Sequence, residues 1–187
     1  LITFCWPLLM AAEFFCGEWL EKRLVLYALS HMVVMPMALI WMAQIGAGAQ
    51  ALPWSVGVVA ALSFFSGASF EVIRKLKAPE DETDTIDSYT KALGTHRAPV
   101  VAMVLLVLST ACSILYLRVV FGQEIPLHWL ALVSVAMLPA AWSLFQFCGT
   151  ALAAHAKMSE ALVGLGSLVN YVVLISAIAV QQGVRWM

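Results

Sequence analysis

The residue types that can do polar chemistry are concentrated in one segment of the chain, residues 70–97, which reads FEVIRKLKAPEDETDTIDSYTKALGTHR. This segment holds five of the ten Lys and Arg residues and six of the eleven Asp and Glu residues. Carboxylate oxygens at such density suit a hard cation such as Mg²⁺, which bridges carboxylates to a phosphate. Arg and Lys side chains bind phosphate oxygens directly. The segment therefore predicts a diphosphate site, and its candidate residues are Arg74, Lys75, Lys77, Glu80, Asp81, Glu82, Asp84 and Asp87.

The rest of the chain is too apolar for a water-soluble domain. Of its 187 residues, 63% are hydrophobic and 11% are charged, and the mean hydropathy is +0.92. Soluble domains carry about 25% charged residues. No basic face is left over for nucleic-acid phosphates, so we expect no nucleic-acid partner. The composition predicts a helical membrane protein that is surrounded by membrane lipids.

Six apolar segments are long enough, or nearly so, to cross the hydrocarbon core, which takes about 20 helical residues. We expect one all-α domain over residues 1–187, a polytopic bundle of membrane-crossing helices. The expected spans cover residues 1–16, 24–45, 52–73, 98–121, 127–151 and 161–182. Pro36 and Pro139 fall inside spans, where proline kinks a helix or leaves a carbonyl for a neighbour to satisfy.

The distribution of positive charge predicts which side of the membrane each loop faces. The connections 17–23, 74–97 and 152–160 lie on one side and hold eight Lys and Arg residues, whereas the other side has Arg118 and Arg185. Cytoplasmic loops carry an excess of Lys and Arg. We therefore expect the charged loop, residues 74–97, to lie on the cytoplasmic side.

The charged loop also has a plain interpretation, as a solvated connection whose lysines anchor the helices at the lipid headgroups. Its length favours a function, because long loops in compact folds often have one. Asp87 has its own alternative role, as the cap of a short helix formed by SYTKALG. Both interpretations of the loop stay open from the residues alone.

Several polar residues fall within the expected spans. Glu13, His31 and Glu71 lie toward the cytoplasmic ends, and Tyr27 shares a helix face with His31 at the i, i+4 spacing. Ionisable groups at membrane depth usually face an interior cavity, so these residues are candidates for the headgroup end of a substrate cavity. The alternative is an internal hydrogen-bond cluster that holds helices together. We expect that second role for Gln146, Asn170 and Tyr171, and close helix packing for the glycines of 164–166.

Two stretches resemble the UbiA superfamily of intramembrane prenyltransferases. One is GEWLEKRLVLYALSHMVVMPMALI, residues 17–40, and the other is FEVIRKLKAPEDETDTIDSYTKALG, residues 70–94, which stands where the family has its second Asp-rich motif. The six expected spans would match helices four to nine of the family's nine-helix fold. The resemblance thus covers nearly the whole chain, and it implies that helices one to three, with the first Asp-rich motif, are absent from it. Bacterial UbiA-like members have a closely similar version of the second stretch, with RK, APEDE and DSY in the same order, which implies the bacterial inner membrane.

The resemblance implies an activity and a set of site residues. Members of the family transfer a prenyl group from a prenyl diphosphate to an aromatic or lipid acceptor and use Mg²⁺. Aligned with the family's second motif, only Asp81 falls on an acidic position, and Glu71, Glu80, Glu82 and Asp84 stand in a different register. The catalytic candidates are Asp81, Glu71 and Arg74. The substrate-binding candidates are Arg74, Lys75, Lys77, Tyr89, His31 and Glu13. The metal-binding candidates are Asp81, Glu82 and Asp84.

The second motif departs from the family pattern in a way that leaves two functions open. Arg74 and Lys77 stand where carboxylates are expected, which removes metal ligands and adds direct phosphate contacts. One interpretation is a divergent prenyltransferase that holds the diphosphate with basic residues. The other is a non-catalytic membrane subunit that binds a quinone, pigment or isoprenoid-like lipid in a larger membrane complex. A transporter would need internal repeats or discontinuous helices, and the sequence shows neither clearly.

Overall fold

The computed structural model describes residues 2–21, 23–83 and 88–183. Within these residues the chain forms helices and turns without a β-strand, so the expected all-α fold is confirmed. The elements are α1 (Ile2–Ala11), η1 (Glu13–Phe15), α2 (Gly17–Glu21), α3 (Leu24–Met32), α4 (Val34–Ala47), α5 (Trp54–Arg74), η2 (Pro79–Asp81), α6 (Tyr89–Leu93), α7 (Arg97–Phe121), α8 (Leu127–Ala136), α9 (Leu138–Thr150) and α10 (Ala153–Gln181).

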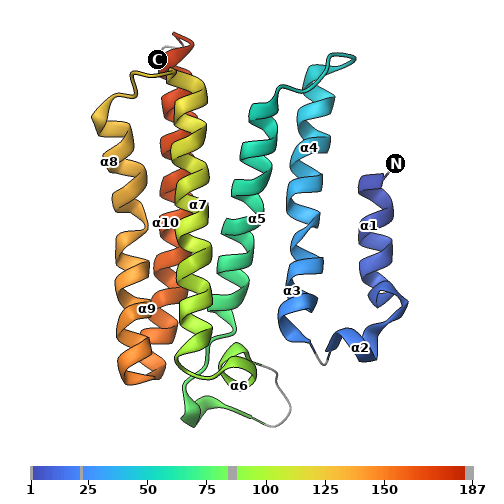
Figure 1. Ribbon diagram of the computed structural model, residues 1–187, viewed down its shortest axis with the longest axis vertical. Helices are drawn as coiled ribbons and strands as arrows, with labels where there is room; N and C mark the ends of the chain where they lie inside the picture. The colour runs from blue at the N-terminus through green and yellow to red at the C-terminus, as the bar shows by residue number, and fades with distance from the viewer. Residues whose placement is uncertain (1, 22, 84–87, 184–187) are drawn as a thin grey trace.

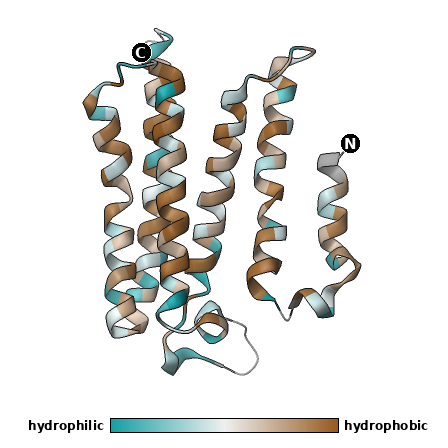
Figure 2. Cartoon of the chain, in the orientation of Figure 1, coloured by the Kyte–Doolittle hydropathy of each residue, from teal (hydrophilic) through white to brown (hydrophobic). Residues whose placement is uncertain are grey.

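The long helices stand side by side in a broad array. Figure 1 shows α1 at one edge and α8 with α9 at the other, while α10 lies behind α7. Apolar residues dominate the length of the helices, and the hydrophilic residues gather near their ends and in the connection that carries α6 (Figure 2). We call the end of the bundle that carries α6 the loop end.

Five segments in the described part of the chain are long and apolar enough to cross a membrane: Leu24–Ala47, Trp54–Arg74, Arg97–Phe121, Leu127–Thr150 and Ala153–Gln181. They agree with five of the expected spans, which is compatible with a multi-pass membrane protein. The remaining expected span, residues 1–16, contains the ten-residue α1 and then a turn. A ten-residue helix rises only about 15 Å, so this sixth crossing stays a prediction.

The last span begins earlier than expected. Residues 152–160 were expected to form a connection, but α10 already starts at Ala153. The sequence AAHAKMSE from Ala153 is made mainly of good helix formers, so its polar residues interrupt the apolar run without interrupting the helix. The polar residues here show where the apolar segment begins, but the helix itself begins earlier.

Both expected proline effects are confirmed. A proline lacks an N–H and its ring clashes with the carbonyl four residues earlier, which breaks the helical hydrogen-bond ladder. The helix ends at Met32, four residues before Pro36, and α4 resumes at Val34. The second break lies between Ala136 and Leu138, ahead of Pro139. Each break interrupts the span by one residue, so the apolar segment continues beyond it.

Small and polar residues let α10 pack closely on its neighbours. A Cβ at Gly166 would lie 2.7 Å from the carbonyl oxygen of Ala136, so only glycine permits this approach to the α8–α9 break. Deeper in the bundle, Asn170 Nδ2 donates a 2.8 Å hydrogen bond to Ser113 Oγ of α7. These contacts confirm close packing at Gly166 and the helix-bridging role of Asn170.

Candidate functional site

The charged loop is packed against the loop end of the bundle. After α5 ends at Arg74, the side chains of Leu76 and Ala78 are buried, and Tyr89 at the start of α6 has no exposed surface. The backbone N–H of Tyr89 donates to the carbonyl oxygen of Lys75 at 3.2 Å, which closes the loop onto its own start. The described parts of this loop are therefore held in place by burial and by hydrogen bonds.

The last turn of α5 carries a compact group of charges. Glu71 Oε2 accepts a 2.7 Å ion-paired hydrogen bond from Arg74 Nη2, and Glu71 Oε1 lies 3.0 Å from Lys75 Nζ. The spacings are i, i+3 and i, i+4, which place all three side chains on one helix face. Two cations share one carboxylate, so this group has a net positive charge. The Glu71 side chain is 14% exposed and that of Arg74 is 52% exposed, so the guanidinium is the accessible part.

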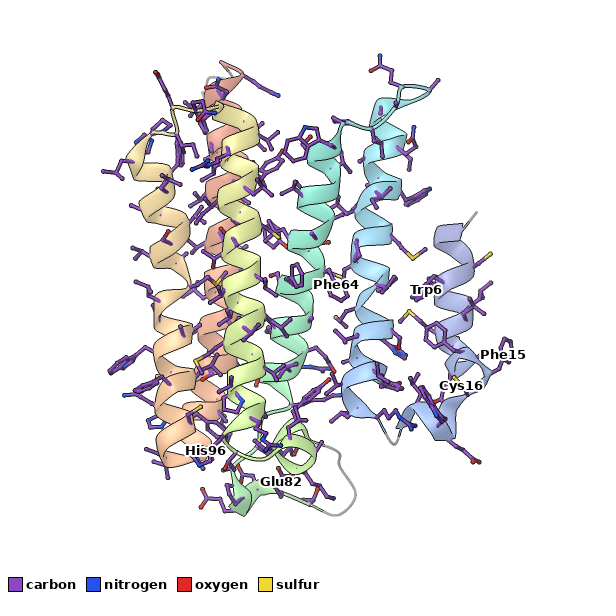
Figure 3. All side chains as sticks on the ribbon, viewed as in Figure 1. Trp6, Phe15, Cys16, Phe64, Glu82 and His96 are labelled. Atoms are coloured by element: carbon purple, nitrogen blue, oxygen red, sulfur yellow. The ribbon has the colours of Figure 1, made fainter. Side chains whose placement is uncertain are left out.

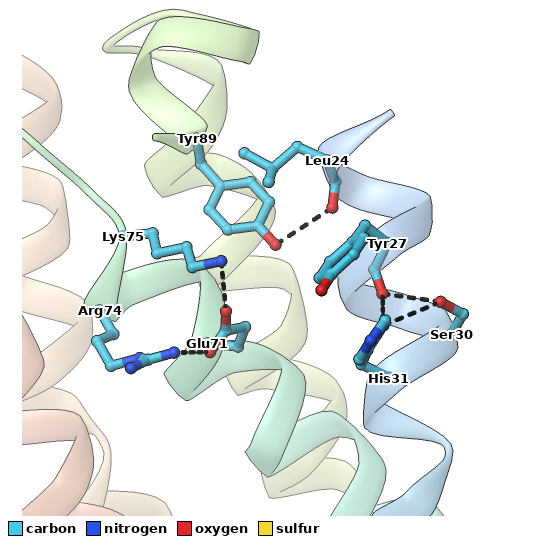
Figure 4. Close-up of polar contacts among 8 residues, drawn as sticks. All are labelled: Leu24, Tyr27, Ser30, His31, Glu71, Arg74, Lys75 and Tyr89. Atoms are coloured by element: carbon cyan, nitrogen blue, oxygen red, sulfur yellow. Dashed lines mark hydrogen bonds and ion pairs between the residues drawn. The ribbon is translucent and has the colours of Figure 1, made fainter. Parts of the chain in front are cut away.

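Tyr89 lies beside this group and reaches across to the N-terminal helices. Figure 4 shows its ring between the Glu71 ion pairs and Tyr27 of α3. Its hydroxyl donates to the carbonyl oxygen of Leu24 at 3.5 Å, a long contact. Burial raises the pKa of the Tyr89 phenol, and the negative charge of Glu71 raises it further. The phenol therefore stays neutral and keeps its proton as a hydrogen-bond donor.

Tyr27 and His31 form the α3 side of the site. Their rings stack with centroids 4.1 Å apart, which confirms the shared helix face. His31 Nδ1 lies 2.8 Å from the Tyr27 carbonyl oxygen; because a carbonyl only accepts, Nδ1 carries the proton and Nε2 is an acceptor in the neutral ring. The Phe14 ring meets His31 edge-on, and Trp6 donates to the Ser30 carbonyl, so α1 braces this part of α3.

Glu82 holds the charged loop together from inside. Its Oε1 accepts hydrogen bonds from Ser88 Oγ and, at 2.7 Å, from Thr90 Oγ1. The Thr90 hydroxyl also accepts from the Lys77 backbone N–H at 3.0 Å. Ser88 is the N-cap of α6, because its Oγ accepts from the Lys91 N–H at 2.9 Å. Figure 3 labels Glu82 within this loop, below the ends of the long helices.

Two sequence expectations change with this network. The N-cap of α6 is Ser88, and Asp87, the expected cap, lies outside the described residues. A serine directly before a helical run is the signal that would have identified it. Glu82, expected as a metal ligand, uses one oxygen for two hydroxyl groups, and its buried Oε2 has no partner among the described residues.

The remaining candidates are dispersed. Asp81 is exposed at the end of η2, and Glu13 is exposed in the turn after α1, where Glu13, Phe14 and Phe15 all have positive φ. Asp84 lies outside the described residues. In the part of the chain that the structure describes, no three His, Cys, Asp or Glu residues are grouped to hold a metal ion. These described residues alone do not fit a magnesium site, so that site stays a prediction that depends on Asp84.

The structure thus brings together four of the ten candidates, Glu71, Arg74, Lys75 and Tyr89, at the loop end. A fifth candidate, His31, lies on the neighbouring helix α3 (Figure 4). The sequence did not predict that the Leu24 carbonyl and Glu160 of α10 belong to this neighbourhood; Glu160 acts electrostatically on Arg74. Both residues come from distant parts of the chain, and no local pattern connects them with the charged loop.

Searches among protein-family models, curated proteins and solved structures found no match for this chain. The resemblance to the UbiA superfamily therefore stays a prediction from the two stretches that carry it.

Proposed function

We propose that this protein binds a prenyl diphosphate at the loop end of its helix bundle, and that this binding serves prenyl transfer to an aromatic or lipid acceptor. The observation that carries the proposal is the group formed by Glu71, Arg74 and Lys75, in which two cations share one carboxylate. A diphosphate is an anion that such an excess of positive charge attracts. The group stands at the end of an apolar span, where a lipid headgroup would lie.

Each residue near the group has a role in this proposal. Arg74 binds a phosphate through its exposed guanidinium, and Lys75 and Lys77, the next cations along the chain, add positive charge. Glu71 holds Arg74 and Lys75 in position, while the neutral phenol of Tyr89 donates a hydrogen bond. The prenyl chain stays among the apolar helices, where its burial from water is favourable by about 0.8 kcal/mol per CH₂ group.

Departure of the diphosphate is the step that these residues assist. The bond between the prenyl carbon and the diphosphate oxygen breaks, and the electron pair leaves with the oxygen. The acceptor attacks the allylic cation and then loses a proton to the departed diphosphate or to water. Arg74 and Lys75 stabilise the negative charge that develops on the leaving oxygen. Asp81 is the candidate carboxylate for a bound Mg²⁺ together with Asp84, and His31 and Glu13 are candidates for contacts with the acceptor.

A second candidate function is a non-catalytic membrane subunit of a larger complex. A specific observation favours it: Glu71 is occupied by two cations and Glu82 by two hydroxyl groups. Carboxylates that are engaged in this way are poor metal ligands. In this case the site binds a quinone-like or isoprenoid lipid on the cytoplasmic side of a bacterial inner membrane without turning it over.

A transfer assay separates the two candidates. The purified chain in lipid nanodiscs is given radiolabelled farnesyl diphosphate and a phenolic acceptor, with Mg²⁺ or with a chelator. Label in the acceptor that depends on Mg²⁺ and is lost in Asp81→Asn, but kept in the exposed-residue control Glu80→Gln, supports the transferase. Saturable binding without transfer under either condition supports the non-catalytic subunit, and absence of binding overturns both.

A further inference from the structure

A pocket lies where α9 ends and α10 begins, and none of the residues that border it belongs to the charge group of α5. It is an open groove of about 420 Å³, bordered by Trp142, Phe145, Gln146, Cys148, Gly149, Thr150 and His155. The pocket is at the loop end, because Cys148 Sγ lies 3.7 Å from the carbonyl oxygen of His96, just before α7. Nothing in the proposed diphosphate site uses these residues.

Hydrogen bonds at the pocket determine which nitrogen of the neutral His155 ring carries the proton. Thr150 has one hydroxyl proton, and it donates this proton to the Gln146 carbonyl oxygen at 2.9 Å. His155 Nδ1 lies 2.8 Å from the same hydroxyl oxygen, so Nδ1 must be the donor in this contact. The neutral imidazole then keeps a lone pair on Nε2. Within the described chain, Nε2 has no partner, so it is an acceptor that a ligand can use.

The side-chain amide of Gln146 is the other free hydrogen-bonding group. It has no partner among the described residues, although it borders the pocket. An amide both donates and accepts, whereas His155 Nε2 accepts. No Lys, Arg, Asp or Glu is among the residues that border the pocket. A phosphate or carboxylate headgroup would meet no charged partner there, so the polar groups fit a neutral head.

Two aromatic side chains border the pocket on the side toward the middle of the span. Trp142 and Phe145 are 62% and 64% exposed, and their ring centroids are 6.0 Å apart with the planes inclined by 29°. Both residues belong to the candidate span Leu127–Thr150, so in a membrane they face lipid. An aromatic head stacks favourably on such rings, and an apolar chain extends from it into the membrane.

We propose that this pocket binds a neutral lipid whose head is an aromatic ring with a hydroxyl group, a phenol or quinol. The ligand hydroxyl donates to His155 Nε2, and the Gln146 amide hydrogen-bonds a second oxygen or the same one. The ring lies against Trp142 and Phe145. Thr150 is a positioning residue, because it holds His155 in the tautomer that accepts.

Photolabelling with two matched probes tests this proposal. The probes are a long-chain alkylphenol with a diazirine in its chain and the methyl ether of the same compound, which differs only in lacking the hydroxyl proton. The full chain in phosphatidylcholine nanodiscs is labelled below saturation and cleaved by cyanogen bromide. Cleavage after Met137 and Met158 releases the fragment 138–158, which contains every residue that borders the pocket.

The expected result is that the phenol labels fragment 138–158 about fivefold more than the ether, which corresponds to one neutral hydrogen bond. His155→Phe keeps an aromatic ring and should remove this preference. His128→Phe, at an exposed histidine of α8, should retain it. Should His155→Phe fold poorly, Gln146→Leu and Thr150→Val should each reduce the preference. Equal labelling by both probes in the wild type, or an unchanged preference in the pocket variants, overturns the proposal.

Discussion

The hydroxyl of Tyr89 lies 3.5 Å from the carbonyl oxygen of Leu24, which is 65 residues earlier in the chain. This contact joins the charged loop to the N-terminal helices, and it does so from a side chain with no exposed surface. The loop is thereby held against both α5 and α3. A loop held in this way can keep Arg74 and Lys75 in a defined place at the membrane boundary.

Tyr89→Ala is expected to destabilise the protein strongly. Removing a fully buried aromatic ring leaves a cavity and costs about 3–5 kcal/mol. Tyr89→Phe keeps the ring and loses only the long hydrogen bond, so its effect should stay within about 1 kcal/mol. Unfolding of the detergent-solubilised protein by increasing sodium dodecyl sulfate measures both. Equal losses of stability in the two variants would show that packing of the Tyr89 ring is not what holds the loop in place.

The same tyrosine predicts a dependence of stability on alkaline pH. Its pKa is raised in the folded protein, mainly by burial, above an unfolded value of about 10. Its contribution is therefore fully present below pH 10 and is lost as the pH rises from there, because only the unfolded state gives up the proton. Tyr89→Phe cannot lose this proton. Compared with the wild type, it should gain relative stability between pH 9 and pH 11, and a constant difference would contradict the assignment.

Glu82→Ala should loosen the charged loop without affecting the long helices. The change leaves Ser88 and Thr90 without their shared acceptor, at a cost of about 1–3 kcal/mol. Limited proteolysis within residues 74–97 measures this loosening. Glu80→Ala is the matched control, because Glu80 is exposed in the same loop. Similar cleavage rates in the two variants would mean that the Glu82 network does not hold the loop.

Gly166→Ala should weaken the packing of α10 on the α8–α9 break. The added Cβ would lie 2.7 Å from the Ala136 carbonyl oxygen, and such overpacking costs about 1–3 kcal/mol. Gly164→Ala is the control, since its Cβ would make an ordinary 3.6 Å contact with Phe70. Thermal unfolding followed by the thiol reactivity of the half-buried Cys112 of α7 compares the two variants. If Gly166→Ala leaves the unfolding temperature unchanged, α10 and the α8–α9 break are farther apart than this contact requires.

Local patterns in the sequence were sufficient for the helices and for part of the site. Apolar runs identified five spans, the two prolines identified the helix breaks, and the i, i+4 spacing identified the Tyr27–His31 stack. Each of these features depends on residues that are close in the chain. The same spacing rule explains how Glu71 meets Lys75.

Features that depend on chain reversal were not predicted. Glu82 meets Ser88 and Thr90 because the loop folds back on itself, and a count of acidic residues assigned Glu82 to a metal instead. The hydrogen bond from the Tyr89 hydroxyl to the Leu24 carbonyl joins two segments that no repeating sequence pattern connects. The polar residues of 152–160 predict a connection before the last span, whereas α10 already begins at Ala153.

Glu71→Gln should strengthen the binding of a prenyl diphosphate. The amide keeps a hydrogen-bond acceptor for Arg74 or Lys75 but removes the negative charge that competes with the ligand. Repulsion between the Glu71 carboxylate and the diphosphate near the protein surface opposes binding by on the order of 1 kcal/mol. Removing this repulsion should lower the dissociation constant about fivefold. The added affinity should diminish at high ionic strength. Weaker binding at all salt concentrations would mean that Glu71 acts mainly by positioning the cations.

In the proposed function, Arg74 and Lys75 together hold an anionic lipid headgroup. The most direct test of this role is the dissociation constant of farnesyl diphosphate for the full chain in nanodiscs, measured for the wild type, for Arg74→Gln with Lys75→Gln, and for Lys157→Gln as an exposed cation of α10. Loss of two charge-assisted contacts should weaken binding about a hundredfold in the double variant and leave Lys157→Gln near the wild type. Equal affinity of all three proteins, or equal affinity of the wild type for farnesol, would contradict the account.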